Sequence, residues 1–549
     1  MRFTLRNRNN YFIIVPVIII CCCHDNHFDS ILFDEALKNG RMANEGLKRC
    51  QKYMNAWLTY SDPATGLIPR NLTRDRHIWN AKDAAADNYP FMVLTSAITD
   101  REMFEGVMLD ILRKETVLTS RIGRLPDTYS FTKRDFEYAR PDLDRIIFGA
   151  SEYVKDGLLP LTEWVGQSPW SERMIGILDD IWIHASVETP FGQIPSGNPE
   201  VNGEMLQTLS RVYWMTGNNK YLEWAIRLGD YYLLDKHHPT KDFDQLRLRD
   251  HGCEIISGLC ELYATVHYAL PEKKRVYEAP IHDMLDWILQ NATNEHGLFF
   301  NNVNPKTGEQ IGDGIADTWG YTYNGFYTVY LIDGTEPYRE AVLNALNHLD
   351  AYKNYDWENG SSDGYADAIE SALNLYNRVP LKAVQDWIDS EIRVMWSLQD
   401  SSYRENAQIW KNSGIIEGWH GDGNFARTTI MVCLWKTQGI TIEPWREDVI
   451  FGAVKDKNNL KISLICSKDW EGKIVFDTPR HYETIKLPMD WPRINQFPEW
   501  FTVMSGEQYR VRNLNHKSIT IYEGQALRRG IPVKMSPNMV YKIEVESKI

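Results

Sequence analysis

The chain has 549 residues, 43% of them apolar and 12% aromatic, which is the composition of a folded protein and excludes a disordered or low-complexity chain. This length accommodates one large domain and a smaller one. A net charge of −14 argues against a nucleic-acid partner or an acidic membrane surface, although a local arginine cluster could still bind a small anionic substrate.

The first predicted element is an export signal over residues 1–23. Three arginines precede an apolar run that is too short to span a bilayer. The run stops at Cys21, Cys22 and Cys23, and an apolar run that stops at Cys resembles a bacterial lipoprotein signal, in which one Cys carries lipid. Because Ile20 replaces the usual small residue before the first Cys, all three remain candidates. We expect export and a membrane attachment by lipid anchor only, with an ordinary signal peptide as the alternative.

Residues 30–440 have apolar residues at helical spacing, in segments of roughly ten to twenty residues. Segments that are apolar nearly all round alternate with amphipathic ones, which predicts two concentric layers of helices. About six segments have buried character, so we predict a mainly α fold with an (α/α)6 toroid as catalytic domain. The predicted helices cover residues 35–58, 89–99, 101–118, 170–185, 204–216, 220–233, 253–269, 277–292, 325–332, 337–352, 366–376, 380–398 and 426–435.

A polar cluster precedes each of the six predicted buried helices. For any single cluster, helix capping is a sufficient explanation. Six clusters at one end of six inner helices would converge on one cavity, where helix N-termini favour an anionic group. The clusters are Asp87-Asn88, Asn202-Gly203-Glu204, Asp250-His251-Gly252-Cys253-Glu254, residues 317–324, residues 363–367 and residues 420–427.

The richest stretch is residues 313–326, where two carboxylates and several aromatic rings stand among glycines. Aromatic faces combined with hydrogen-bonding groups suit a sugar, whose ring faces are apolar and whose edge carries hydroxyls. The alternative is that the rings fill a core. The candidate sugar-binding residues in this stretch are Asp317, Trp319, Tyr321, Tyr323 and Asn324.

Four titratable residues outside that stretch are further candidates. His251 and His420 begin buried helices beside carboxylates, where a histidine could transfer protons near neutral pH or simply cap a helix. Arg427 could bind a substrate carboxylate or pair with Asp422. Glu204 could donate a proton into the cavity or cap its own helix.

Short strand patterns separated by turns replace the helical pattern after residue 441. We predict a small antiparallel β-sandwich over residues 445–549, with an irregular loop over residues 490–500. No catalytic constellation is seen in this domain, and we expect it to support the toroid.

Several site types have no motif in this sequence. It contains no glycine-rich phosphate loop, no GxSxG elbow and no HExxH helix. The cysteines beyond residue 23 form no CxxC pair, and His237-His238 lacks ligand spacing, so neither a metal site nor a disulfide framework is predicted.

Residues 32–440 resemble the bacterial polysaccharide-degrading enzymes of the (α/α)6 type, which include unsaturated glucuronyl hydrolases and heparinase-like lyases. Within that group the chain looks most like the oligosaccharide dehydratases of ulvan degradation in marine flavobacteria. The resemblance is carried by residues 250–254, 317–324 and 419–427. It implies an anionic oligosaccharide substrate and no cofactor. The implied reaction removes water from a non-reducing-end uronic acid and leaves a 4,5-unsaturated uronate.

The resemblance also implies roles for the candidate residues. Such an elimination needs a base at C5, an acid at the 4-hydroxyl and a neutralised carboxylate. His251 and His420 are candidates for the base, and Tyr321 and Tyr323 for the acid. The expected substrate-binding residues are Asn424 and Arg427 at the carboxylate, Trp319 against the ring, and Asp87, Asn88, Asp317, Asn324, Asp363 and Asp422 around it.

Three other hypotheses about the function stay open. The first is a glycoside hydrolase of β-glucuronidase type, with Glu204, Asp317 and Asp363 as paired carboxylates. The second is a non-catalytic, glycan-binding surface lipoprotein. The third is a scaffold without a sugar site, whose polar clusters would scatter over both faces of the toroid. The linkage attacked and the oligomeric state are left open.

Overall fold

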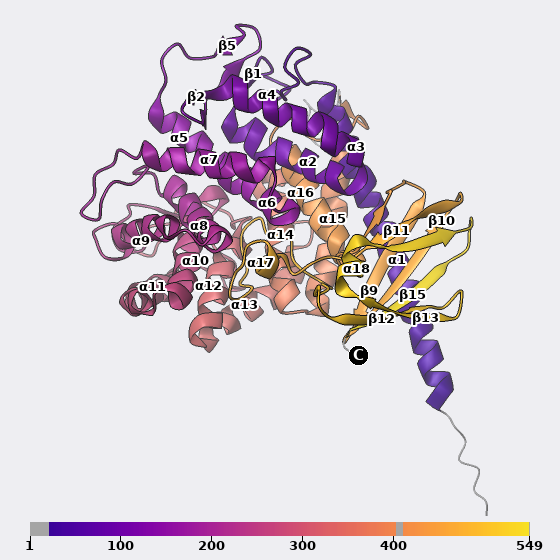
Figure 1. The fold of residues 1–549 in the computed structure, drawn as a ribbon. Helices are drawn as coiled ribbons and strands as arrows, with labels where there is room; N and C mark the ends of the chain where they lie inside the picture. Colours follow the sequence, from indigo (N-terminus) through magenta and orange to yellow (C-terminus); the bar gives the residue numbers. More distant parts are fainter. Residues whose placement is uncertain (1–20, 402–409, 548–549) are drawn as a thin grey trace, which may run out of the picture.

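The computed structural model describes residues 21–401 and 410–547 (Figure 1). The predicted signal segment up to residue 20 lies outside the described residues, and so do the side chains of Cys21, Cys22 and Cys23, which begin helix α1. Export and lipidation therefore stay predictions. None of the described helices combines the length and the apolar character that a membrane crossing requires.

Amphipathic and buried helices alternate along the described part of residues 21–437, which confirms the mainly α prediction. The amphipathic helices form an outer layer: α1 (Cys21–Leu58), α4 (Leu109–Thr119), α7 (Pro169–Ile183), α9 (Asn219–Leu233), α11 (Pro271–Asn291), α13 (Glu336–His348) and α15 (Lys382–Ser401). The buried helices form the inner layer: α2 (Tyr89–Thr99), the continuous run α5 (Leu143–Glu152), η3 (Tyr153–Leu158) and α6 (Leu159–Val165), then α8 (Pro199–Thr216), α10 (Glu254–Ala269), α12 (Trp319–Asp333), α14 (Ser362–Arg378) and α16 (Gly421–Thr437).

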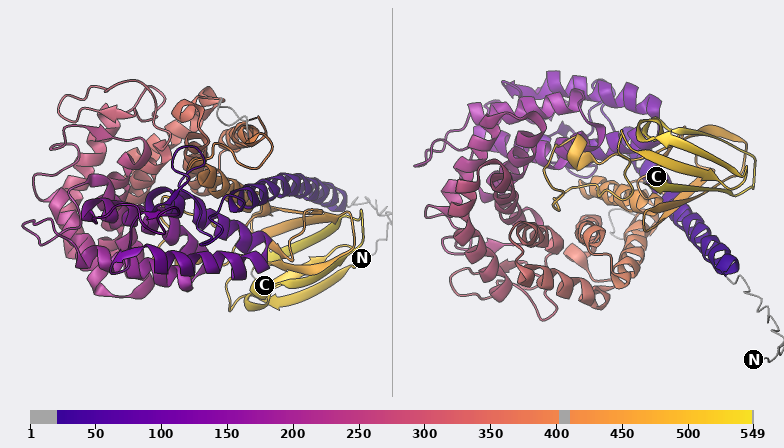
Figure 2. Two further views of the ribbon diagram at one scale, coloured as in Figure 1. Left: turned by 90° about the horizontal axis from the view of Figure 1, so that it is seen from above. Right: turned by 60° about the horizontal axis from the view of Figure 1, so that its bottom comes forward.

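The inner helices contact one another in chain order, and α16 returns to α2 to close the ring (Figure 2). Among the described residues this layer has seven members, one more than predicted. The additional member is residues 143–165, where no helix was predicted from the sequence. Its charged residues, among them Lys155 and Asp156, interrupt the apolar pattern, yet both are at least 95% buried. Apolar spacing did not predict this helix, because several of the positions that it buries carry charged side chains.

Two glycines set the close approach of neighbouring inner helices α8 and α10. A Cβ on Gly203 would lie 2.4 Å from the backbone nitrogen of Ile255, and one on Gly258 would lie 2.6 Å from the carbonyl oxygen of Gly203. Side chains at these positions would push the helices apart, so glycine is required for this packing.

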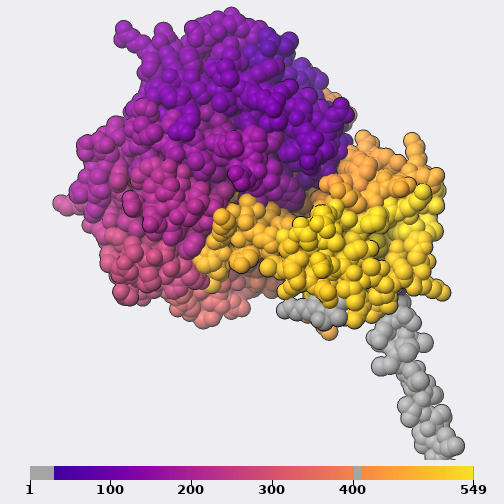
Figure 3. Space-filling view, viewed as in Figure 1, coloured from indigo at the N-terminus to yellow at the C-terminus, as the bar shows by residue number. Residues whose placement is uncertain are grey.

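The C-terminal residues form two antiparallel sheets, which confirms the predicted antiparallel β-structure. Both sheets contribute buried side chains to the same apolar core as the helices, and they lie against one side of the ring (Figure 3). One sheet has the order β13-β12-β15-β10-β9, formed by β9 (Val449–Asp456), β10 (Asn459–Cys466), β12 (Gln508–Asn513), β13 (Ser518–Glu523) and β15 (Tyr541–Ser547). The other has the order β14-β11-β8, formed by β8 (Thr441–Glu443), β11 (Trp470–Val475) and β14 (Ile531–Met535).

The connection between β11 and β12 leaves the sheets and enters the ring. Residues 491–498, part of the predicted irregular loop, are buried. Arg493 is 0% exposed and forms ion pairs with Glu163 of α6 at 2.8 Å and with Asp490 at 2.9 Å. We call residues 490–500 the inserted loop, and Arg493 is its main charged anchor in the ring.

Arg493→Ala should lower the free energy of unfolding by about 3–5 kcal/mol, because it leaves the buried Glu163 carboxylate without its partner. Arg510→Ala is the control, since Arg510 pairs with Glu546 at 2.7 Å on the sheet with both side chains about one-third exposed. That change should cost no more than about 1 kcal/mol. Denaturant unfolding followed by circular dichroism measures both, and equal losses would contradict the anchoring role.

Candidate active site

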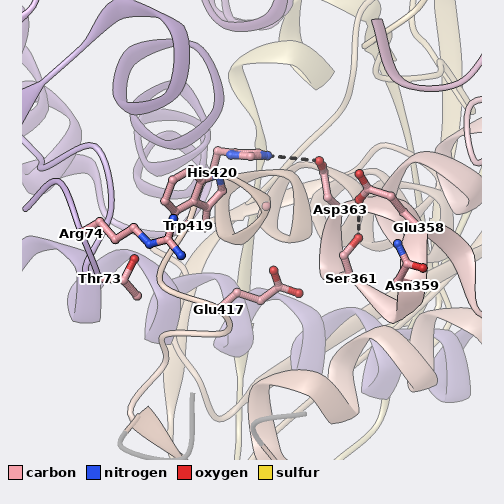
Figure 4. Close-up of a pocket in the computed structure, with 10 residues that line it drawn as sticks. Thr73, Arg74, Glu358, Asn359, Ser361, Asp363, Glu417, Trp419 and His420 are labelled. Atoms are coloured by element: carbon pink, nitrogen blue, oxygen red, sulfur yellow. Dashed lines mark hydrogen bonds and ion pairs between the residues drawn. The ribbon is translucent and has the colours of Figure 1, made fainter. Parts of the chain in front are cut away.

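The N-terminal ends of six inner helices and the middle of the run 143–165 surround one cavity of about 290 Å³, which we call the carboxylate chamber. The predicted convergence of distant clusters is therefore found in the structure. A second cavity of about 410 Å³, which we call the Trp419 chamber, adjoins it. Glu358, Asp363 and His420 line both chambers, and Figure 4 shows the direct contact between His420 and Asp363 in the wall of the Trp419 chamber.

Seven predicted site residues line the carboxylate chamber: Asp87, His251, Tyr321, Asp363, His420, Asn424 and Arg427. Glu204 lies directly behind the wall, with its Oε1 atom 3.9 Å from Nδ1 of His251 and neither carboxylate oxygen hydrogen-bonded within the described part of the chain. Asp317 is buried next to the chamber, and burial together with the charges of Glu358 and Asp250 raises its pKa to about 7.

Other predicted residues are packed in the core. Trp319 is 0% exposed, and the Tyr323 hydroxyl donates to the carbonyl oxygen of Gly297 at 2.5 Å. Residues 319 and 323 are one helical turn apart and share the core face of α12, whereas Tyr321 lies on the opposite face, toward the chamber. Placing Trp319 against a substrate ring and Tyr323 at a substrate hydroxyl therefore disagrees with the structure.

Asn88, Asn324 and Asp422 are also buried and do not line either chamber. The Tyr53 hydroxyl donates to the backbone and side-chain oxygens of Asn88. Asp422 accepts hydrogen bonds from the Trp57 indole and from the backbone of residues 416–418. It therefore fixes the turn before α16, and its predicted pairing with Arg427 is absent from the described ion pairs.

Both histidines of the chamber are held as cations by surrounding carboxylates. Burial alone would lower the pKa of His420, but Asp363, 3.4 Å from its Nε2 atom, and the nearby Asp87 raise it to about 10. His251 lies 3.5 Å from Asp250, and the charges of Asp250, Glu152 and Asp156 raise its pKa well above the usual value against the effect of burial. An imidazolium suits charge stabilisation or proton donation better than proton abstraction.

Two aspartates of the chamber have pKa values displaced in opposite directions. Burial raises the pKa of Asp87 to about 7, although the charges of His420 and His251 oppose that rise. Asp87 has no hydrogen-bond or ion-pair partner among the residues described. Burial would also raise the pKa of Asp363, but His420 and a 2.6 Å hydrogen bond from Asn424 lower it to about 2. One carboxyl is thus poised to donate a proton while the other stays ionised.

The cations that line the chamber are paired with protein carboxylates. Arg427 is 4% exposed and contacts Asp367 at 2.5 Å, Glu370 at 2.9 Å, and the Tyr321 hydroxyl at 3.3 Å. The other cations pair as follows: Lys82 with Glu152 at 3.2 Å, Lys155 with Asp156 at 2.7 Å and with Glu254, and Arg247 with Asp250 and, at 3.8 Å, with Glu200. A substrate carboxylate would have to compete with these partners.

Two groups of side chains around His251 have the ligand types of a cation site. His251 belongs to both groups: the first also contains Glu152 and Glu200, and the second also contains Asp156 and Glu254. Within each group the ligand atoms lie within 4.8 Å of one another. Lys82 and Lys155 pair with three of these carboxylates, at Glu152, Asp156 and Glu254. Positive charge of the protein itself therefore balances these groups.

Left-handed backbone is found at three residues that line the chamber. Asp250 has φ 50°, Glu358 has φ 46° and Asn495 has φ 59°, in the region that non-glycine residues seldom adopt. Strained residues of this kind gather at functional sites, where the surrounding fold holds them in place.

Several residues that line the chamber were not predicted from the sequence. Glu152, Lys155 and Asp156 come from the unpredicted inner helix, and Asn495 comes from the inserted loop. The available signal was the pair of charges Lys155-Asp156 in the middle of a segment with many apolar residues. No local signal marked Asn495.

No family model and no curated protein matches the chain. Among solved structures it is similar to the GH76A α-1,6-mannanase from Salegentibacter sp., with TM-score 0.40 and 10% identity over 71% of this chain and 98% of that one. It is also similar to cellobiose 2-epimerase from Bacillus thermoamylovorans, with TM-score 0.36 and 11% identity over 50% and 84% of the two chains. The unsaturated glucuronyl hydrolase from Bacillus sp. GL1 gives TM-score 0.35 and 14% identity over 54% and 86%.

Asp87→Asn should stabilise the protein in a pH-dependent way. The folded protein keeps the Asp87 proton up to about pH 7, whereas the unfolded chain loses it near the ordinary value of 3.8. The unfolding free energy of the wild type therefore falls between these pH values, and the variant lacks this fall. Its relative gain should grow from pH 4 to pH 7 and then level off, on the order of a few kcal/mol at most.

Thermal unfolding at several pH values measures this gain. The control is Asp110→Asn, since Asp110 is exposed and pairs with Arg113 on the outer surface of α4. A gain for Asp87→Asn that is the same at pH 4 and pH 8 would contradict the raised pKa.

Proposed function

We propose that the carboxylate chamber is the active site of a glycoside hydrolase, with Asp87 as general acid and Asp363 as general base or nucleophile. The observation that carries this proposal is the opposite displacement of the pKa values of two carboxyls in one cavity, to about 7 and to about 2. Such a pair has the two protonation states that glycosidic bond cleavage requires.

The reaction needs a proton at the departing oxygen and a carboxylate at the sugar carbon or at the attacking water. Between about pH 2 and pH 7, Asp87 is protonated and Asp363 is ionised. Asp87 has no protein partner within the described chain, so its proton is free for a substrate. Asp363 stands where the two chambers meet, so a sugar chain that extends through both would present a glycosidic bond there.

His420 and Asn424 act in this proposal as positioning residues. Asn424 donates to Oδ1 of Asp363, and His420 faces Oδ2, so both carboxylate oxygens are oriented. Asp363, and not a histidine, acts as the base, because both chamber histidines are held as imidazolium ions.

An uncharged sugar unit fits the chamber better than the uronic acid implied by the sequence resemblance. Lys82, Lys155 and Arg427 are each engaged by a protein carboxylate, so binding a substrate carboxylate would break an existing pair. Trp419 and Tyr321 supply aromatic surface in the two chambers, and the surrounding carboxylates accept hydrogen bonds from sugar hydroxyls.

Elimination of water from a uronic acid is the second candidate. It is favoured by the Tyr321 hydroxyl, which lies in the chamber next to Arg427 and Asp367 and could protonate a leaving hydroxyl. Incubation with uronic-acid oligosaccharides separates the two reactions. Elimination would create an ultraviolet-absorbing conjugated double bond and remove the mass of one water, whereas hydrolysis adds one water and divides the chain.

We also propose export with a lipid anchor, supported by the apolar run that ends at Cys21, Cys22 and Cys23. The mass of the mature N-terminal peptide tests this, since an unmodified cysteine there would contradict it.

Asp87→Asn and Asp363→Asn should each lower kcat by about 10²–10⁴-fold, because each removes one proton-transfer group. Wild-type activity should fall above pH 7 as Asp87 loses its proton, and Asp87→Asn should lack that limb. The assay uses 4-nitrophenyl glycosides and neutral oligosaccharides of several sugars and linkages. Asp110→Asn should retain full activity. Wild-type rates in either aspartate variant would contradict the proposal.

A further inference from the structure

The inserted loop contributes to the wall of the carboxylate chamber. All other lining residues belong to residues 82–427, whereas Ile494 and Asn495 reach the chamber from the connection between two C-terminal strands. The part of the chain expected only to support the toroid therefore contacts the candidate active site directly.

Three inner helices hold the tip of this loop. The backbone nitrogen of Asn495 donates to Glu370 of α14 at 2.7 Å, and its side-chain Nδ2 donates to Asp156 of η3 at 2.8 Å. Arg211 of α8 donates to the carbonyl oxygen of Ile494 at 3.2 Å. Asn495 has φ 59°, a left-handed conformation that asparagine tolerates better than most residues.

One polar atom at the tip is left without a partner. The Asn495 side chain is 1% exposed, and its Oδ1 atom accepts no hydrogen bond from the described residues. A buried carbonyl oxygen without a donor is unfavourable, so a donor brought by a ligand would improve its environment. This oxygen has almost no accessible surface of its own, so a sugar hydroxyl in the chamber would reach it after a small rotation of the Asn495 side chain.

The inserted loop also closes the end of the chamber that lies deepest in the ring. Glu370 and Arg211 lie two to three turns beyond the N-terminal ends of their helices, which is deeper in the ring than the chamber-lining residues Asp363 and Glu200. Because the loop is buried at this depth, the chamber has a floor. A sugar chain can enter from the Trp419 chamber but cannot continue through the ring.

We propose that Asn495 is a substrate-binding residue that accepts a hydrogen bond from a hydroxyl of the terminal sugar, and that the inserted loop restricts the enzyme to chain ends. This inference rests on the proposed hydrolase function. Beyond that function, it specifies that the enzyme attacks chain ends and that the C-terminal segment contacts the substrate.

The mode of attack is tested on wild-type protein with fluorescently labelled neutral hexasaccharides of the manno-, gluco-, galacto- and xylo-series. Exo action predicts that one short product of constant length is released from the first time point. Intermediate lengths should then appear in descending order. A mixture of middle-sized fragments at the earliest time point would overturn the inference while leaving hydrolysis intact. If none of these sugars nor the 4-nitrophenyl glycosides is cleaved, the hydrolase function itself fails.

Asn495→Gly tests the residue, because glycine keeps the left-handed backbone and removes the carboxamide. We expect KM to rise roughly five- to tenfold, the effect of one lost hydrogen bond, with a smaller change in kcat. Asn377→Ala is the matched control, since Asn377 donates to the Glu499 carbonyl oxygen of the same loop at 2.8 Å and lines neither chamber.

The control should keep the wild-type KM even if its melting temperature falls. Asn495→Asp provides a second variant, which keeps the oxygen but places a charge beside Asp156 and should also raise KM. If both Asn495 variants melt at lower temperature but keep the wild-type KM, the residue has a structural role and the proposed contact is wrong.

Discussion

Pairing of buried charges between neighbouring elements is the constraint on which the ring depends. Arg211 of α8 pairs with Glu261 of α10, Arg427 of α16 pairs with Glu370 of α14, and Arg493 joins the inserted loop to α6. Each of these arginines is at least 96% buried, so loss of one partner would leave an uncompensated charge in the core. The inner helices must therefore meet in one register, and this register also fixes which groups face the chamber.

The candidate active site lies where this pairing is incomplete. Asp87 faces several carboxylates and two imidazolium groups without a direct partner, and Glu204 is fully buried with both oxygens unbonded among the described residues. Such groups lower stability, and burial raises the pKa of each. These groups lie beside the ionised Asp363 at a cost in folding stability. In exchange, the cavity holds protons where a reaction can use them.

Much of the architecture could be predicted from local patterns. Helical periodicity gave the alternating layers, and polar clusters before buried helices correctly located the chamber through His251, Tyr321 and His420. The same periodicity could have separated Tyr321 from Tyr323, since neighbours two apart in a helix face different sides. Residues 143–165 were missed because their buried charges find partners far away in the sequence. Asn495 was missed because its partner Asp156 is 339 residues distant, and no local pattern encodes such a contact.

The inserted loop fills space that the seventh inner helix creates at the centre of the ring. At the same spacing of about 9–10 Å between neighbouring axes, a ring of seven helices is about 3 Å wider across its centre than a ring of six. Interiors tolerate few voids, so a ring of seven needs additional chain in its centre. Residues 491–498 supply it, and the helix that widens the ring also supplies Glu163 and Asp156, which bind the loop. A floor beneath the chamber is therefore a consequence of how this ring packs, and the C-terminal sheets are its support.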